Sequence, residues 1–252
     1  MSSTVAAMGT PELLILAGAL AGGFVVGLTG FGGGLTALPF WLTAAPPVLA
    51  APLVVVTSLL SHLTTLKSIW RLIDWQRAGP FIAGGALGVP VGTLILTFVT
   101  AAGFKVIFGV FLAVYAAVNL ARAQPVVQWG GWLADGVVGV LGGVLGGFAG
   151  LSGPPVTIWA NLQGWSKDQK RGVFGGFNMM IQVFATASMG WNGYLTADLS
   201  RLVLIATPGT LIGTWIGRWT FDRVGEGVFN RAVLILLLCS GVVTTVTGAM
   251  AL

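Results

Sequence analysis

Two glycine-rich stretches interrupt apolar segments of this chain 120 positions apart: GLTGFGGG, Gly27–Gly34, and GFAGLSGPP, Gly147–Pro155. Glycine permits positive φ angles and close backbone approach, and proline suits the first turn of a helix. A soluble domain has little use for such a break in its most apolar segments. In a membrane transporter, an unwound stretch between two half-helices presents backbone amides to a solute. The two stretches therefore predict a membrane protein with paired broken helices.

Composition supports a membrane protein. The 252-residue chain is 56% hydrophobic and 8% charged, whereas about a quarter of the residues in a soluble domain are charged. Its one cysteine, Cys239, allows neither an intrachain disulfide nor a cysteine metal site. The net charge of +5 comes from cations in short loops, where they set the orientation in a membrane rather than bind nucleic acid.

Ten apolar runs divide the chain, and we interpret all of them as helices because they are long or glycine-rich and lack the alternation of a strand. Several approach the ~20 residues that cross a bilayer. The predicted fold class is therefore an all-α polytopic membrane protein. The runs cover residues 12–29, 35–43, 48–66, 78–99, 104–121, 131–149, 155–163, 172–190, 201–217 and 229–250.

The two halves of the chain look like a duplication. Residues 1–124 form the first predicted membrane repeat and residues 125–252 the second, and the linker RAQPVVQ, Arg122–Gln128, divides them. Beyond the glycine stretches, GVPVGT at Gly88–Thr93 matches GTLIGT at Gly209–Thr214. For the glycines of these two segments we prefer close helix packing, which small residues allow in membranes.

Charge distribution decides between two topologies. If each glycine stretch joins two parts of one spanning helix, the halves run parallel and the Lys and Arg residues divide five against seven between the two sides. If each stretch is the tip of a re-entrant hairpin, each half is one hairpin plus three spans, and the second half is inverted. The division is then ten against two, with Lys105 and Arg201 on the minority side. Because this asymmetry fits the positive-inside rule, we expect inverted repeats with both termini outside.

Four polar residues repeat the 120-residue spacing, since Ser58 and His62 correspond to Asn178 and Gln182. Each pair is spaced i, i+4 and so lies on one helix face. Hydroxyl and amide groups bind an oxyanion without the cost of a buried charge. We take all four as candidate substrate-binding residues, with interhelical hydrogen bonding as the alternative. His62, the only histidine, is also a candidate for carrying a coupled proton.

The glycine stretches supply the other candidates. A helix that starts at Pro154 would point amide donors and a positive dipole end back at the preceding residues, a cradle for an anion. Tight packing of small residues is the alternative. Neither stretch is followed by Gly-Lys-Ser/Thr or preceded by a strand, which excludes a phosphate-binding loop and a dinucleotide fold. The candidate substrate-binding residues here are Gly30, Phe31, Gly32, Gly33, Leu151, Ser152, Gly153 and Pro154.

Asp135 differs from the other loop carboxylates because it lies inside an apolar run. We take it as a second candidate for cation coupling, with an interfacial position close to Trp132 as the alternative. The sequence contains no Ser-His-Asp set, no paired-carboxylate site and no cluster of metal ligands. We therefore expect no enzyme activity, no cofactor and no metal site.

At GLTGFGGG, GLSGPPVTIW and RGVFGGFNMMIQVFATAS (Arg171–Ser188), the chain resembles the TauE/SafE sulfite-exporter family. The likeness covers nearly all of the chain. It implies an integral membrane protein, usually counted as about eight helices in two repeats, that moves sulfite, sulfonates, sulfoacetate or related anions. The first half has Gly34-Leu35 where the second has Pro154-Pro155, so the two tips need not bind substrate equally.

We therefore expect a secondary transporter of small anions in the inner cell membrane, with sulfite or a small organosulfonate such as sulfoacetate as substrate. The two hairpin tips would meet near the midplane, and one repeat would rock against the other. An anion channel and a transporter of a non-sulfur carboxylate are the alternatives. The expected partners are the small anion, the lipid bilayer and a coupled proton or sodium ion, but no nucleic acid. The sequence leaves the oligomeric state open.

Overall fold

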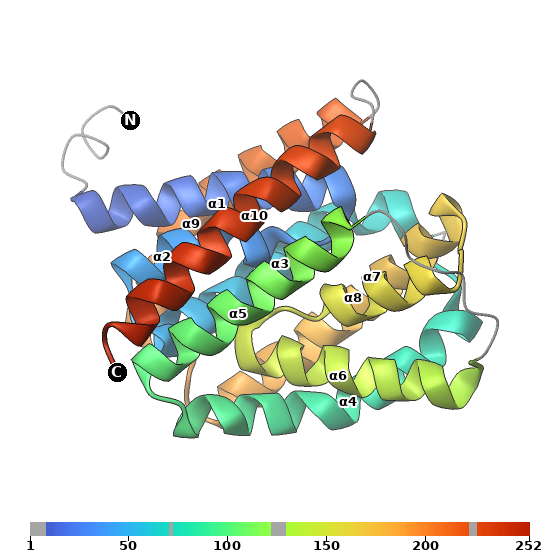
Figure 1. The fold of residues 1–252 in the computed structure, drawn as a ribbon, viewed down its shortest axis with the longest axis horizontal. Helices are drawn as coiled ribbons and strands as arrows, with labels where there is room; N and C mark the ends of the chain where they lie inside the picture. Colours follow the sequence, from blue (N-terminus) through green and yellow to red (C-terminus); the bar gives the residue numbers. More distant parts are fainter. Residues whose placement is uncertain (1–8, 71–72, 122–129, 222–225) are drawn as a thin grey trace.

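The computed structural model describes residues 9–70, 73–121, 130–221 and 226–252 (Figure 1). These residues form ten helices and no strand. The helices are α1 (Thr10–Thr29), α2 (Gly33–Ala44), α3 (Pro47–Ile69), α4 (Trp75–Phe98), α5 (Ala101–Leu120), α6 (Trp132–Ala149), α7 (Gly153–Leu162), α8 (Lys167–Trp191), α9 (Ala197–Phe221) and α10 (Glu226–Ala249). The helical interpretation of all ten apolar runs is confirmed. The predicted boundary after residue 124 lies outside the described residues.

Among the described residues, six helices are long and apolar enough to cross a membrane, which confirms the polytopic fold class. They are α1, α3, α4, α5, α6 and α9. The helix α10 contributes a shorter apolar stretch, Leu237–Ala249. The helices α2 and α7 have 12 and 10 residues, so they reach only about 15–18 Å of a hydrocarbon core that is ~30 Å thick.

Glycine ends the long arm of each hairpin at the same place in the two halves. The helix α1 ends at Gly30, whose φ of 81° is left-handed and whose N–H donates to the Val26 carbonyl over 2.8 Å. The helix α6 ends at Gly150, with a φ of 71° and the same bond to the Gly146 carbonyl, also 2.8 Å long. Only glycine adopts this conformation without strain from a Cβ. The 120-residue spacing of the motifs is therefore a spacing of helix ends.

The short arm of each hairpin begins three residues after that glycine. The helix α2 begins at Gly33 and α7 at Gly153, again 120 positions apart. The long arms have 20 and 18 residues and the short arms 12 and 10, so both hairpins are lopsided, as the run lengths predict. Each three-residue tip leaves backbone polar groups without helical partners inside the protein.

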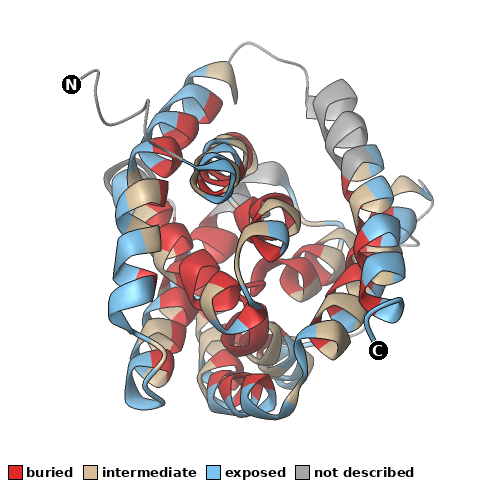
Figure 2. Ribbon diagram, turned by 90° about the vertical axis from the view of Figure 1, so that its left-hand side faces the viewer, coloured by how far each residue is buried: buried red, intermediate tan, exposed pale blue. Residues whose placement is uncertain are grey.

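The two halves of the chain are interlocked. The helix α1 of the first half packs along α9 of the second, α6 of the second packs along α4 of the first, and α5 packs along α10. The helices α3 and α8 contact each other in the interior, where buried residues gather in Figure 2. Figure 1 shows α1 and α5 running from left to right and their counterparts α6 and α10 from right to left. Opposite directions of corresponding helices are what an inverted repeat requires.

Glycine brings the interlocked helices together backbone to backbone. A Cβ on Gly88 or Gly92 of α4 would collide with the carbonyl oxygens of Val140 or Val144 on α6. A Cβ on Gly213 of α9 would collide in the same way with a carbonyl oxygen of α1. Close approach of small residues is a main source of helix association in lipid, where the hydrophobic effect does not hold helices together. The packing interpretation of GVPVGT and GTLIGT is confirmed.

Candidate functional site

The tips of the two hairpins meet inside the protein and enclose a narrow cavity. A Cβ on Gly34 would lie 3.0 Å from the Leu151 side chain, and a Cβ on Gly153 would lie 3.2 Å from Phe31, so the tips touch. The space left free by atoms, with the open solvent at its mouth included, is about 300 Å³. The cavity is lined by Val26, Phe31, Gly32, Gly33, Gly34, Leu35, Ser58, His62, Gly150, Leu151, Ser152, Gly153, Pro154, Asn178 and Gln182.

Eleven of the twelve candidate substrate-binding residues line this one cavity. The twelfth, Gly30, is the left-handed glycine of the first tip and directly precedes the lining residue Phe31. Folding thus brings both glycine stretches and both polar pairs to one place. Four lining residues were not among the candidates. These are Val26, Gly34, Leu35 and Gly150, which belong to the glycine stretches or directly flank them.

Asn178 keeps an unused hydrogen-bond donor in the cavity wall. The residue is 2% exposed, and its Oδ1 accepts a hydrogen bond from the Ser152 hydroxyl over 2.8 Å. Its Nδ2 is buried without a partner among the described residues. A buried donor without an acceptor costs about 1–3 kcal/mol. The cavity therefore favours a ligand that brings an oxygen acceptor to this nitrogen.

Gln182 is oriented by the second hairpin tip. Its Nε2 donates to the Gly150 carbonyl over 3.0 Å. The amide cannot turn over without placing its own oxygen against that carbonyl oxygen, so Oε1 has to face away from the tip. Within the described part of the chain this Oε1 is buried and has no partner. The two amides thus leave one free donor and one free acceptor at the cavity.

The first polar pair faces the same cavity from α3. His62 is 4% exposed, and its Nδ1 lies 2.7 Å from the carbonyl oxygen of Ser58, one turn earlier in the helix. This contact holds the ring against its own helix. Ser58 is also buried. The pairs Ser58/His62 and Asn178/Gln182 therefore line one cavity, as their spacing predicts.

The first tip presents more backbone donors than the second. Neither half-helix has a side-chain cap at its start, where Gly32 precedes α2 and Ser152 precedes α7. The unsatisfied N–H groups of such a helix start, together with its positive dipole end, attract anions. Pro154 and Pro155 have no N–H, so the first turn of α7 offers fewer donors than that of α2. An anion in the cavity therefore finds more backbone donors on α2.

Asp135, the other candidate for ion coupling, lies apart from the cavity. Its Oδ1 accepts a hydrogen bond from the Trp159 indole over 2.7 Å, which ties the short arm α7 to the long arm α6. The first hairpin has a similar tie, because the Trp41 indole donates to the Ile15 carbonyl over 2.9 Å. Ile15 and Asp135 are 120 positions apart. The geometry gives Asp135 the role of holding a hairpin together.

Neutral groups dominate the electrostatics of the cavity. No Lys, Arg, Asp or Glu side chain is among its described lining residues. Hydrogen-bond donors and helix dipoles act strongly in a low-dielectric interior and avoid the cost of burying a second charge. The described residues also contain no group of three or more His, Cys, Asp or Glu side chains that could hold a metal ion. The arrangement suits reversible binding of a small anion.

The fold and the cavity define a polytopic helical membrane protein with a cavity between two broken helices, the place where many secondary transporters bind their solute. The sequence model described as "Sulfite exporter TauE/SafE" matches residues 14–244, nearly the whole chain. The chain belongs to this family. The resemblance based on the glycine stretches and the segment Arg171–Ser188 is thus confirmed.

A curated relative agrees with this assignment. The chain is 27% identical over 178 residues to the "Probable sulfite/organosulfonate exporter TauE" of Cupriavidus necator, a match that covers 67% of this chain and 69% of the relative. No solved structure matches the chain. Family and relative together support a membrane anion transporter.

Proposed function

We propose that this protein is a secondary transporter of small anions and that sulfite or a small organosulfonate such as sulfoacetate is its substrate. The observation that carries the proposal is the cavity at the hairpin tips. There the buried Nδ2 of Asn178 and the uncapped start of α2 offer donors that the described residues do not use. A small oxyanion supplies the acceptors that these donors lack.

The dimensions of the cavity favour a small substrate. The two tips touch each other, so little space lies between them in this conformation. The tetrahedral or pyramidal oxygens of a sulfonate or sulfite diverge in space, so one group can reach Asn178, Ser58 and the start of α2 together. A bulky anion would have to push the hairpins apart.

Transport by alternating access requires groups of helices that move against each other around the bound anion. Rocking one intact half against the other would separate the glycine-packed pairs α1–α9 and α4–α6, each of which joins the two halves. We therefore place the boundary elsewhere. One moving group contains α1, α2 and α9, the other contains α4, α6 and α7, and α3 and α8 lie between them.

We place the protein in the inner membrane with both chain ends outside. The ten-to-two division of cations supports this orientation. One of the two minority cations, Arg201, forms an ion pair with Glu12 over 3.3 Å. This pair joins the starts of α9 and α1 and cancels one of the two charges that run against the positive-inside rule.

Flux measurements in proteoliposomes test the proposal. Purified protein would be offered sulfite, thiosulfate, sulfoacetate, taurine and oxalate, with protein-free liposomes as control. Saturable uptake that is accelerated by unlabelled substrate inside the vesicles supports a transporter. Flux that rises linearly with concentration and shows no such counterflow would indicate a channel. A clear preference for oxalate over every sulfur compound would reject the proposed substrate class.

A further inference from the structure

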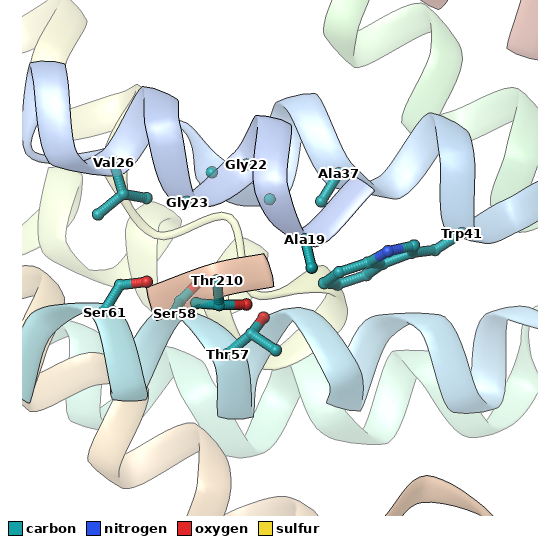
Figure 3. Close-up of a pocket in the computed structure, with 12 residues that line it drawn as sticks. Ala19, Gly22, Gly23, Val26, Ala37, Trp41, Thr57, Ser58, Ser61 and Thr210 are labelled. Atoms are coloured by element: carbon teal, nitrogen blue, oxygen red, sulfur yellow. The ribbon is translucent and has the colours of Figure 1, made fainter. Parts of the chain in front are cut away.

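A second cavity lies beside the first hairpin, between this hairpin and helices α3 and α9 (Figure 3). Its free space, with the open solvent at its mouth included, is about 220 Å³. The cavity shares Val26, Gly33, Gly34 and Ser58 with the central cavity at the hairpin tips, so the two adjoin. In Figure 3, Trp41 stands at one end of the second cavity, and Val26 and Ser61 lie towards the other.

Hydroxyl groups form the polar part of the second cavity. They belong to Thr57, Ser58 and Ser61 of α3 and to Thr210 of α9. Thr57 donates its hydrogen to the carbonyl of Leu53, one turn earlier, over 2.7 Å. Thr210 is different, because its Oγ1 is buried without a hydrogen-bond partner in the described part of the chain. With the residue 2% exposed, this hydroxyl is a free donor at the cavity.

The corresponding place beside the second hairpin is filled. At the spacing of 120 residues, Thr57 and Ser61 correspond to Phe177 and Ile181, which are both 0% exposed. These two side chains press against the long arm of the second hairpin. A Cβ on Gly142 of α6 would lie 2.7 Å from the Phe177 ring.

The fourth hydroxyl also has no counterpart beside the second hairpin. In the match between GTLIGT and GVPVGT, Thr210 corresponds to Val89, which is buried. Packing at this position is therefore compatible with an apolar side chain of nearly the same shape. The hydroxyl of Thr210 adds a buried polar group that the repeated fold does not require, and a bound ligand accounts for it.

We propose that the hydroxyl-lined cavity is a second binding site for the transported oxyanion, next to the central cavity on its route through the protein. This inference rests on the proposed transport function. Ser58 lines both cavities, and Gly33 and Gly34 form a wall between them that carries no side chain. An anion that leaves the start of α2 thus passes Ser58 and meets the hydroxyl of Thr210.

The chemistry of the lining selects an anion. Hydroxyl groups can donate to the oxygens of sulfite or a sulfonate. No Asp or Glu is among the described residues of this cavity, so a cation would lack the carboxylate that usually balances its charge. Phe177 and Ile181 fill the corresponding place beside the second hairpin. The second site therefore lies beside the first hairpin alone.

Thr210→Val tests the second site, because valine keeps the shape of threonine and removes only the hydroxyl. The readouts are sulfite uptake by proteoliposomes, thermal stabilisation by sulfite, and fluorine NMR of protein labelled with 5-fluorotryptophan. The Trp41 signal, assigned by its loss in Trp41→Phe, reports on the second cavity. Sulfite is expected to shift this signal in the wild type. In Thr210→Val we expect the shift to need an about tenfold higher sulfite concentration and uptake to be about tenfold slower. Thermal stabilisation by sulfite is expected to be retained.

Thr207→Val is the matched control, since Thr207 lies on the same helix and donates its hydroxyl hydrogen to the Val203 carbonyl over 2.7 Å. Thr207→Val is expected to show wild-type sulfite uptake and a wild-type Trp41 response to sulfite. Wild-type uptake and a wild-type Trp41 response in Thr210→Val would overturn the second site. A Trp41 signal that shifts with sodium chloride but not with potassium sulfite would also overturn the second site, because the cavity would then bind a cation. If sulfite does not stabilise even the wild type, the transport function fails and this proposal fails with it.

Discussion

Asn178→Leu is the most direct perturbation of the central cavity. The Nδ2 of Asn178 is buried without a partner among the described residues, so in the proposed complex it donates to an oxygen of the bound anion. A hydrogen bond to a charged group contributes about 1.5–3 kcal/mol. Its removal is expected to raise the Kd for sulfite by roughly ten- to 150-fold.

One compensating effect limits this change. The Ser152 hydroxyl donates to Asn178 Oδ1 over 2.8 Å, and leucine would leave that hydroxyl free to donate to the anion instead. Asn178→Asp removes this ambiguity, because aspartate keeps the acceptor for Ser152 but replaces the donor with a second oxygen. Repulsion between this oxygen and the anion adds to the lost hydrogen bond. The expected order of affinity is therefore wild type, then leucine, then aspartate.

Isothermal titration calorimetry with sulfite at constant pH measures the three affinities. Asn192→Leu is a suitable control, since the exposed Asn192 follows the same helix and its amide donates only to the Ser188 carbonyl, over 2.8 Å. The control should bind sulfite like the wild type. A Kd within twofold of the wild type for both Asn178 variants would refute the reasoning and place the anion away from the amide pairs.

The remaining predictions concern the tips, the histidine and the topology. Gly153→Val is expected to abolish uptake with expression largely intact. The valine side chain would enter the contact between the tips, where even a Cβ lies 3.2 Å from the side chain of Phe31. Near-normal flux would show that the motif serves helix packing only. His62→Gln is expected to bind sulfite yet lose the pH dependence of uptake, and an unchanged pH profile would remove the histidine from coupling. In a Cys239→Ser background, a cysteine at Gln76 and a cysteine at Ser166 should both resist an impermeant thiol reagent outside intact cells, whereas one at Asn192 should react; labelling of only one of the first two positions would reject the inverted topology.

Local features of the sequence predict most of the fold. The left-handed ends at Gly30 and Gly150 follow from the conformational freedom of glycine, and the lengths of the apolar runs predict ten helices and the lopsided hairpins. The repeat spacing of 120 residues also predicts that Ser58, His62, Asn178 and Gln182 face one site. All four line one cavity, as expected if the halves are a duplication whose related residues meet near a twofold axis between them.

Contacts between helices lay beyond these local rules. Asp135 was a candidate for coupling from its position in an apolar run, but the structure pairs it with Trp159 on another helix. The glycine-packed pairs α1–α9 and α4–α6 similarly change the boundary expected for a rocking motion. Neither feature can be seen in a single segment, because each depends on which helix lies alongside.

By itself, the sequence determined the class of protein, the broken helices and the residues of the central cavity, since hydropathy, glycine conformation and repeat spacing are properties of short segments. Only the tertiary structure decided where unused hydrogen-bonding groups remain, at Asn178, Gln182 and Thr210 among the described residues. Whether a buried polar group is satisfied depends on the distance to every neighbour in space. Those neighbours come from helices far apart in the chain, and their packing leaves the second cavity as well as the first.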